Sequence, residues 1–337
     1  MAGVTARAQR APNSPQARGP QSRAAQDRVT VDLSAVVVAV AGETPRVLAL
    51  RGPGGVEALP AGPLEPQHRT LELGLRAWVE AQTGQPLGYV EQLYTFGDRD
   101  RHLAGPGRVL SVGYLALLRE AAPAGDSSWS DWYRHFPWED RRGGRPELLD
   151  RIETALAGWV EAAAAEPERR RREARLRLAF GLGGLPWGEE RVLERYELMY
   201  EAGLAAEAHQ DAPGDGNRPA CPALAEGAPM AADHRRILAT AIGRLRGKIK
   251  YRPVVFELMP PTFTLSQLQR TVEALAGLRL HAPNFRRLVD SQGLVEETGE
   301  VAGGTGGRPA RLVRFRREVL QEQPEPGVRL PLSRRPG

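Results

Sequence analysis

The sequence predicts an α+β protein: a mixed sheet with a packed helix comes first, a helical segment follows, and a C-terminal unit of helices and a hairpin ends the chain. Strand-like runs rich in β-branched residues flank a helix signal over residues 29–120. The last third has the order helix, short strand, helix, turn, helix, hairpin. A chain of 337 residues exceeds what one hydrophobic core organises, so we expect two or three domains.

Charge is placed unevenly along the chain. The net charge is +5, yet residues 233–320 alone hold 16 Lys and Arg against eight Asp and Glu, so the middle of the chain is acidic. This distribution fits a protein with one polyanion-binding module, and it fits a solvated basic face equally well. Cys221 is the only cysteine, which excludes an internal disulfide and indicates a reducing compartment.

Membrane and secretion signals are not evident in the sequence. No apolar run reaches membrane-spanning length, and residues 1–28 are basic without the apolar core of a secretion signal. We therefore expect a soluble cytoplasmic protein without a membrane partner, whose residues 1–28 form a disordered basic tail.

The first domain is predicted over residues 29–125. Residues 31–41 and the run PRVLALR predict a buried hairpin around the turn GET. A helix follows a loop rich in Pro and Gly, because Thr70 can cap it, apolar residues recur at helical spacing and Gly84 can end it. The strand-like runs LGYVEQLYTF and RVLSVGYLALL complete a mixed sheet.

Residues 126–228 are predicted to form a separate aromatic and helical segment. Five of the 20 aromatic residues fall in residues 126–142, a cluster that is more typical of a packing patch than of a base-stacking surface. Residues 210–228 have the composition of a linker. Helical patterns lie between them, over residues 146–164, 167–180 and 188–209.

Residues 229–320 have the element order of a winged helix-turn-helix domain. A basic amphipathic helix leads into the short extended run VVFELM, after which Thr264 caps a helix that Gly277 ends. Pro283 lies near the first turn of the next helix, and two strands then surround a Gly-rich tip. We expect residues 321–337 to be a disordered tail.

The loop and helix of residues 59–84 invite comparison with the Nudix box, in which several glutamates on one helix face hold Mg²⁺ against a diphosphate. With Gly62 as the box glycine, Arg76 matches the box arginine and Glu80 one of the paired glutamates. The metal cluster is broken, so we predict neither a metal site nor catalytic residues. The other glutamate positions hold His68, Ala77 and Ala81, or Trp78, Ala81 and Gln82 when Gly84 sets the register.

The same loop and helix can still bind a ligand without metal chemistry. The backbone of residues 59–64, Arg76 and polar groups near Tyr94, Thr95 and Gly97 can cradle a diphosphate and a ribose. The alternative is a helix that only packs on the sheet, and the residue pattern alone favours that alternative.

The C-terminal unit carries a candidate DNA-binding surface. Asn284, Arg286 and Arg287 lie at the front of the second helix of the helix-turn-helix, where Asn suits adenine and Arg suits guanine. The hairpin adds a Gly-rich tip and arginines at roughly alternate positions, a wing that can reach phosphates. Helix and wing together favour DNA binding over a winged helix that binds only protein. The wing arginines are Arg308, Arg311, Arg314 and Arg316.

Lys248 and Lys250 are the only lysines in the chain, and Arg252 follows them closely. A catalytic lysine needs burial or a charged neighbour that lowers its pKa, and the sequence around these lysines indicates neither. We therefore predict that these three residues contact DNA phosphates, for which a lysine serves as a flexible point charge.

Two separate parts of the chain resemble the Nudix-related transcriptional regulators of NAD metabolism, the NrtR family. The first is YVEQLYTFGDRDR followed by GRVLSVGYLAL, and the second runs from KYRPVVFELMPPTFTLSQLQ to GRPARLVRF. The resemblance covers about residues 29–120 and 236–320. It implies a Nudix-like α/β/α sandwich that senses ADP-ribose or a related NAD-derived nucleotide, joined to a winged helix that binds double-stranded operator DNA as a homodimer.

The resemblance also implies a repressor of NAD biosynthesis or salvage genes, located at the nucleoid, that requires no cofactor and leaves DNA when the nucleotide binds. The long segment 126–228 and the loop LPAGPLEPQHR depart from the family pattern. The implied ligand positions are Gly62, Arg76, Glu80, Thr95 and Gly97. The implied DNA positions are Lys248, Lys250, Arg252, Asn284, Arg286, Arg287, Arg308 and Arg311.

Two other functions stay open on the sequence. The chain can be a Nudix hydrolase of ADP-ribose-like nucleoside diphosphates with an accessory winged helix, although the carboxylate count opposes this. It can also be a scaffold that binds neither nucleotide nor DNA, which predicts no DNA retardation even at low salt.

Overall fold

The computed structural model describes residues 29–97, 108–211, 226–303, 309–322 and 327–328. Cys221, His102 and the predicted N-terminal tail lie outside these residues. Within them, no helix is both long and apolar enough to cross a lipid bilayer.

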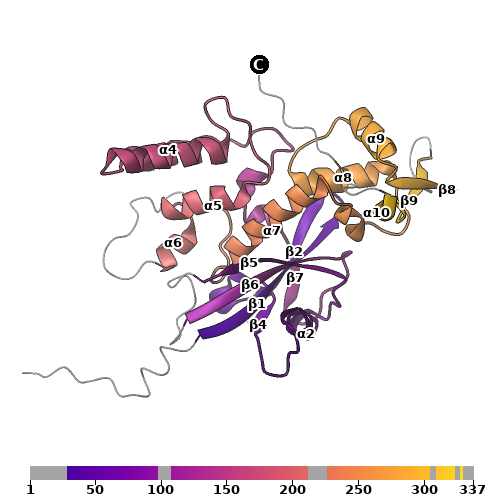
Figure 1. Cartoon of the computed structure of the whole chain (residues 1–337), viewed down its shortest axis with the longest axis horizontal. Helices are drawn as coiled ribbons and strands as arrows, with labels where there is room; N and C mark the ends of the chain where they lie inside the picture. The colour runs from indigo at the N-terminus through magenta and orange to yellow at the C-terminus, as the bar shows by residue number, and fades with distance from the viewer. Residues whose placement is uncertain (1–28, 98–107, 212–225, 304–308, 323–326, 329–337) are drawn as a thin grey trace, which may run out of the picture.

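A mixed sheet forms the N-terminal part of the described chain (Figure 1). Its main strand order is β3-β2-β1-β6-β5, with β4 paired to β1 and β7 paired to β2. β1 and β6 run parallel over ten residue pairs, whereas the other pairings are antiparallel. The strands are β1 (Val29–Ala41), β2 (Thr44–Arg51), β3 (Glu57–Ala58), β4 (Ala61–Pro63), β5 (Tyr89–Phe96), β6 (Arg108–Leu117) and β7 (Ser127–Asp131).

The central strand β1 is buried on both faces, which explains its nearly continuous apolar sequence. Leu33 and Val37 pack with Leu75 of helix α2 (Leu71–Thr83), whereas Val36 and Val38 belong to the core on the opposite face. α2 begins and ends as predicted: Thr70 accepts a hydrogen bond from Leu73 N, and Gly84 adopts a left-handed conformation at φ 68°.

The other face of the sheet is covered by helix α7 (His234–Ile249), which packs against β1, β5 and β6. Figure 1 shows α2 on one side of the sheet and α7 on the other, so the predicted α/β/α layers are confirmed. α7 also packs against α5 (Val192–Glu201) and α8 (Leu265–Ala276). The other α-helices of the described chain are α3 (Leu148–Glu161), α4 (Glu166–Phe180), α6 (Ala206–Asp211), α9 (Ala282–Ser291) and α10 (Val319–Glu322).

The C-terminal unit is a winged helix, with one correction to its predicted elements. The run VVFELM is the 3₁₀ helix η5 (Val254–Leu258), in which Val255 and Leu258 are three residues apart and share a buried face. The extended pairing lies further on, where Phe263 and Val313 exchange two backbone hydrogen bonds of 2.9 and 2.8 Å. Phe263 thereby joins the wing strands β8 (Val295–Val301) and β9 (Arg311–Phe315).

Three other predicted boundaries were wrong. The sheet does not stop at residue 125, because β7 pairs with β2 from Ser127 to Asp131. The helical pattern over 188–209 divides into α5 and α6, because Gly203 takes a left-handed conformation at φ 74°. The C-terminal tail is not wholly disordered: α10 ends at Glu322, and Val328 is fully buried and donates its N–H to Ile249 O.

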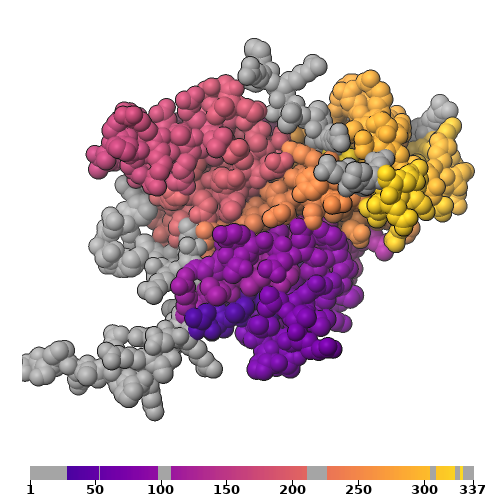
Figure 2. All heavy atoms as spheres, viewed as in Figure 1, coloured from indigo at the N-terminus to yellow at the C-terminus, as the bar shows by residue number. Residues whose placement is uncertain are grey.

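The aromatic cluster is a packing patch, as predicted. Trp132, Phe136 and Trp138 have no exposed surface, and they belong to a core shared by the sheet, the middle helices and the C-terminal unit. Figure 2 shows the middle helices and the C-terminal unit side by side above the sheet.

Glu139, at the end of the 3₁₀ helix η3 (Pro137–Glu139), forms a buried ion-pair cluster with Arg195 of α5 and Arg246 of α7. Arg195 Nε and Nη2 lie 2.5 and 2.8 Å from the two carboxylate oxygens, and Arg246 Nη1 lies 2.6 Å from Oε2. Burial raises the pKa of Glu139, but the two guanidinium groups lower it by more than burial raises it, so the net pKa shift is downward. Arg246 also donates to Leu275 O at the end of α8, at 3.0 Å.

Glu139→Gln removes the negative charge that both buried arginines require. Breaking a buried ion pair on one side costs about 3–5 kcal/mol, so we expect a loss of that size in the free energy of unfolding. Chemical denaturation followed by circular dichroism measures it. Glu166→Gln, which breaks exposed pairs on α4, is the matched control and should leave the midpoint almost unchanged. Equal denaturation midpoints for both variants would contradict the stabilising role of the Glu139 ion-pair cluster.

Candidate functional site

The loop that was expected to cradle a phosphate has almost no free backbone donors. Of residues 59–64, two are prolines, and three have bonded N–H groups: Leu59 N donates to His234 Nδ1, Ala61 N to Gln82 Oε1, and Leu64 N to Val31 O. The remaining N–H, that of Gly62, lies in strand β4, where Gly62 pairs with Leu33 of β1. These bonds, which go to side chains of α2 and α7 and to the backbone of β1, favour the alternative in which the loop and helix pack on the sheet over a backbone cradle.

Trp78 of α2 covers this loop. A Cβ on Gly62 would lie 2.4 Å from the indole ring, and Trp78 Nε1 donates to Pro63 O at 2.9 Å. His68 packs edge-on against the same indole, with ring centroids 6.3 Å apart, and its Nδ1 accepts from Glu65 N. In either register of the Nudix box, one glutamate position is thus occupied by a ring that holds the loop on the helix: His68 when Gly62 sets the register, and Trp78 when Gly84 does. Among the described residues, no group of three or more His, Cys, Asp or Glu side chains could hold a metal ion.

Arg76 and the other predicted ligand positions do not form one compact cluster. Gly62 pairs with Leu33, Leu33 with Val112, and Val112 with Thr95, so Gly62 and Thr95 lie on one row across the sheet. Arg76 instead contacts the start of β5, donating to Leu87 O and to Gly88 O, the latter at 3.0 Å. Thr95 lies six residues after Tyr89, the first residue of β5, which is about 20 Å along the strand at about 3.3 Å per residue.

The two remaining ligand positions lie apart from Arg76's contacts. Glu80 is exposed on α2, and its carbonyl accepts the capping N–H of Gly84. Gly97 follows β5, and its carbonyl accepts two hydrogen bonds from the Arg108 guanidinium at 2.8 and 3.3 Å. A ligand that touched all five predicted positions would have to be elongated.

A polar cluster that the sequence did not reveal lies between α2 and the sheet. Tyr114 of β6 is almost fully buried and donates to Gln92 Oε1 at 3.3 Å, directly across from it on β5. Burial, followed by the charge of Glu72, raises the pKa of the Tyr114 hydroxyl. Glu72 in turn pairs with Arg76 at 2.8 Å. In the sequence, only the alternation of side chains along β6 could have indicated this position of Tyr114, because it places Tyr114 on the same face as Val112 and Ala116.

The winged helix presents part of the predicted DNA set on its surface. Asn284, Arg286 and Arg287 are exposed at the front of α9, and Arg287 Nη2 donates to Asn284 Oδ1 at 2.6 Å. On the wing, Arg311 and Arg314 form exposed cross-strand pairs of 2.6 Å with glutamates of β8. Such pairs are weak in water, so phosphates can displace the glutamates. Arg308 lies outside the described residues.

The two lysines are placed differently from the prediction. Lys248 Nζ lies 2.5 Å from Glu91 Oε2 and 2.9 Å from Tyr89 OH, both on β5, and its side chain is only 17% exposed. Lys250 Nζ lies 2.5 Å from Glu190 Oε1. Lys248 was therefore assigned wrongly as a phosphate contact, because its ammonium faces the sheet. Arg252 is exposed just beyond α7.

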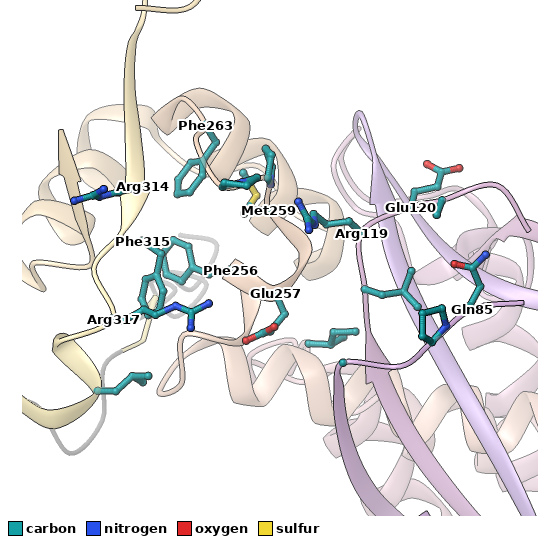
Figure 3. Close-up of a pocket in the computed structure, with 18 residues that line it drawn as sticks. Gln85, Arg119, Glu120, Phe256, Glu257, Met259, Phe263, Arg314, Phe315 and Arg317 are labelled. Atoms are coloured by element: carbon teal, nitrogen blue, oxygen red, sulfur yellow. The ribbon is translucent and has the colours of Figure 1, made fainter. Parts of the chain in front are cut away.

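A groove of about 1030 Å³ separates the sheet from the winged helix (Figure 3). One wall comes from the loop before β5 and the end of β6, and the other from η5, β9 and the chain before α10. Figure 3 shows side chains from both walls turned toward the space between them. The lining includes Gln85, Arg119, Phe256, Glu257, Phe315 and Arg317.

Comparison with known proteins matches this architecture. The family model described as the NrtR DNA-binding winged helix domain matches residues 255–315. The structure resembles that of Shewanella oneidensis NrtR complexed with a 27mer DNA, with a TM-score of 0.51 and 20% identity, over 86% of this chain and 95% of that one. The chain has the fold of this solved NrtR structure, and residues 255–315 match the family's winged helix domain.

Two further proteins are similar to this chain, one in fold over most of its length and one in sequence over a short part. A MutT/nudix family protein from Enterococcus faecalis has the same fold, with a TM-score of 0.51, 16% identity and coverage of 86% of this chain and 87% of that one. The ADPR responsive transcriptional repressor NtrR of Acinetobacter baylyi is 42% identical over 86 residues, which is 26% of this chain. The aligned part spans only 34% of that repressor's length.

Asp32, beside the loop of residues 59–64, gives a pH test of this region. Asp32 pairs with Pro63 of β4 across the sheet, and burial raises the pKa of its carboxyl from 3.8 to about 6, although a backbone hydrogen bond from Leu33 opposes the rise. Because the folded pKa lies above the unfolded one, ionisation destabilises the fold as pH rises from about 4 to 6.

We therefore expect Asp32→Asn to match the wild type in stability below about pH 4 and to exceed it by up to about 3 kcal/mol above pH 6, at about 1.4 kcal/mol per pKa unit. Urea denaturation of both proteins at a series of pH values measures the difference. A difference that does not change with pH would show that Asp32 is not destabilised by burial.

Proposed function

We propose that this protein is a DNA-binding transcriptional repressor whose Nudix-like domain senses ADP-ribose or a related NAD-derived nucleotide. The observation that carries the proposal is the exposed pair Asn284 and Arg286 at the front of α9, inside the segment that matches the NrtR DNA-binding winged helix. The Acinetobacter relative is named an ADPR responsive transcriptional repressor, which supports ADP-ribose as the proposed effector. Genes of NAD synthesis or salvage are the proposed targets.

The proposal treats the Nudix-like domain as a sensor and not as a hydrolase. With Gly62 as the box glycine, His68 occupies a position where hydrolysis needs a carboxylate, and Ala81 leaves Glu80 without its paired glutamate. With Gly84 setting the register, Trp78 occupies such a position. We propose that the Arg76 guanidinium is the phosphate ligand, and that the Thr95 side chain and the Gly97 backbone, at the other end of β5, contact the rest of the nucleotide. Magnesium-dependent release of AMP from ADP-ribose, abolished by Glu80→Gln, would instead support the hydrolase alternative.

The proposal also divides the chain by role. Residues 29–131 form the sensing unit, the segment to about residue 228 connects it to the rest, and residues 229–320 bind DNA. We propose a homodimer in the cytoplasm at the nucleoid, because two copies of α9 can read two half-sites of an operator.

A binding experiment tests both halves of the proposal. Selection from random duplex DNA yields an operator, and fluorescence anisotropy then measures its Kd with and without ADP-ribose. We expect ADP-ribose to raise the Kd at least about fivefold, the lower end of typical allosteric coupling. No retardation of any duplex at low salt would refute DNA binding, and indifference to all NAD-related nucleotides would refute sensing.

Two single variants should separate base reading from phosphate contact. Arg286→Ala should weaken operator binding by about 5- to 150-fold, with a smaller effect on unrelated DNA, because a bidentate base contact is worth about 1–3 kcal/mol. Arg311→Ala should weaken binding to all sequences alike and lower the slope of log K against log salt by about one. Anisotropy titrations at several salt concentrations measure both effects. Equal losses on operator and unrelated DNA for Arg286→Ala would remove it from the base-reading set.

A further inference from the structure

Arg76 holds the loop that leads into β5. Its guanidinium donates to the carbonyls of Leu87 and Gly88, the last two residues before the strand begins at Tyr89. Its Nε also donates to Glu72 Oε1, at 2.9 Å. A ligand phosphate that binds Arg76 competes with these acceptors, and each carbonyl that loses its donor releases a constraint on the start of β5.

The start of β5 is tied directly to α7. Lys248 Nζ, Tyr89 OH and Glu91 Oε2 bond to one another, with Tyr89 OH 2.8 Å from the Glu91 oxygen. The ammonium also lies 5.6 Å from the centroid of the Tyr89 ring. Both ionic side chains are about four-fifths buried, so water weakens this contact less than it weakens an exposed pair.

α7 is in turn tied to the winged helix within the same helical turn. Arg246, two residues before Lys248, donates to Leu275 O at the end of α8 and contacts the Tyr133 hydroxyl at 3.3 Å. Tyr133 OH donates to Ala274 O, also at the end of α8, at 2.7 Å. The last turn of α7 therefore contacts the sheet through Lys248 and the helix-turn-helix through Arg246.

We propose that Lys248 couples the nucleotide site to the DNA-binding unit, acting through Tyr89 and Glu91 of β5. This inference rests on the proposed function, since it assigns the route by which nucleotide binding at Arg76 shifts the winged helix. Nucleotide at Arg76 loosens the loop of residues 85–88, the start of β5 moves, and the Lys248 contact no longer holds α7 in the same position. That loop also lines the groove facing the winged helix, so its movement changes both contacts between the units.

Lys250 provides a matched control. It is the other lysine of the chain, it follows Lys248 at the end of α7, and its ammonium pairs with Glu190 in the middle segment, with Glu189 at 3.9 Å. Loss of Lys250 therefore removes an equal charge and an ion pair of the same length from the same helix end, but it leaves β5 untouched.

The test compares coupling, not affinity alone. The full-length wild type, Lys248→Met and Lys250→Met are titrated with operator DNA with and without ADP-ribose, and calorimetry measures ADP-ribose binding to each free protein. We expect the ratio of the two DNA Kd values to fall toward one in Lys248→Met and to stay at the wild-type value in Lys250→Met. ADP-ribose should still bind Lys248→Met. Glu91→Gln should lower the ratio in the same way, and the double variant with Lys248→Met should lose no more than either single variant.

Each result separates this inference from the proposed function. A wild-type ratio of one refutes nucleotide-controlled DNA binding, and the coupling role of Lys248 with it. A wild-type ratio well above one that persists in Lys248→Met refutes only the role of Lys248. An equal fall of the Kd ratio in Lys250→Met would mean that any loosening of α7 abolishes coupling. That result would also overturn the specific route through β5. If Lys248→Met fails to fold, Glu91→Gln, which keeps the side-chain shape, decides the question.

Discussion

A single buried carboxylate, Glu139, determines how the parts of this molecule are arranged. Its two oxygens are shared by Arg195 and Arg246, and none of the three side chains is more than 1% exposed. Desolvating three charges is costly, and the cost is recovered only when every partner is in place with good geometry. The middle helices, α7 and the end of α8 can therefore pack together in one relative position. The backbone supports this position: Gly277 ends α8 so close to Glu139 that a Cβ there would lie 2.4 Å from the Glu139 carbonyl oxygen.

This constraint gives a role to the long middle segment. The segment contributes Trp132, Phe136 and Trp138 to a core that also contains residues of the sheet and of the winged helix. The described residues of the segment, from 126 to 211, therefore pack as a structural layer between the other two units. Because the Glu139 cluster fixes α7 against the middle helices, the groove of Figure 3 is the place where the sheet and the winged helix can change their separation. A sensor that controls a DNA-binding unit needs such a pair of features, one contact that is fixed and one that is adjustable.

Local signals in the sequence predicted the elements that local chemistry determines. Thr70 and Gly84 delimit α2 as expected, since a cap involves residues only a few positions apart. β7 was missed because SSWSD has no strand pattern of its own and is held by β2, some 80 residues earlier. The Glu139 cluster was missed for the same reason, because a glutamate in the run EDRR has the pattern of an exposed residue. Arg76 can be proposed from its place in the box pattern, whereas Tyr114 and its contacts depend on strand register that the sequence does not specify.

The choice of lysine at position 248 fits a contact that has to form and break. In a chain that uses arginine almost everywhere, an arginine here would present a planar fork and bind Glu91 through two parallel hydrogen bonds. The lysine ammonium is a compact point charge with three donors, and it satisfies Glu91 and Tyr89 from one atom. Burial lowers the pKa of Lys248, but Glu91 and Tyr89 raise it more, so the group stays charged at neutral pH. Its flexible four-carbon stem also lets the ammonium move away from Glu91 without the fixed geometry that a bidentate guanidinium pair requires.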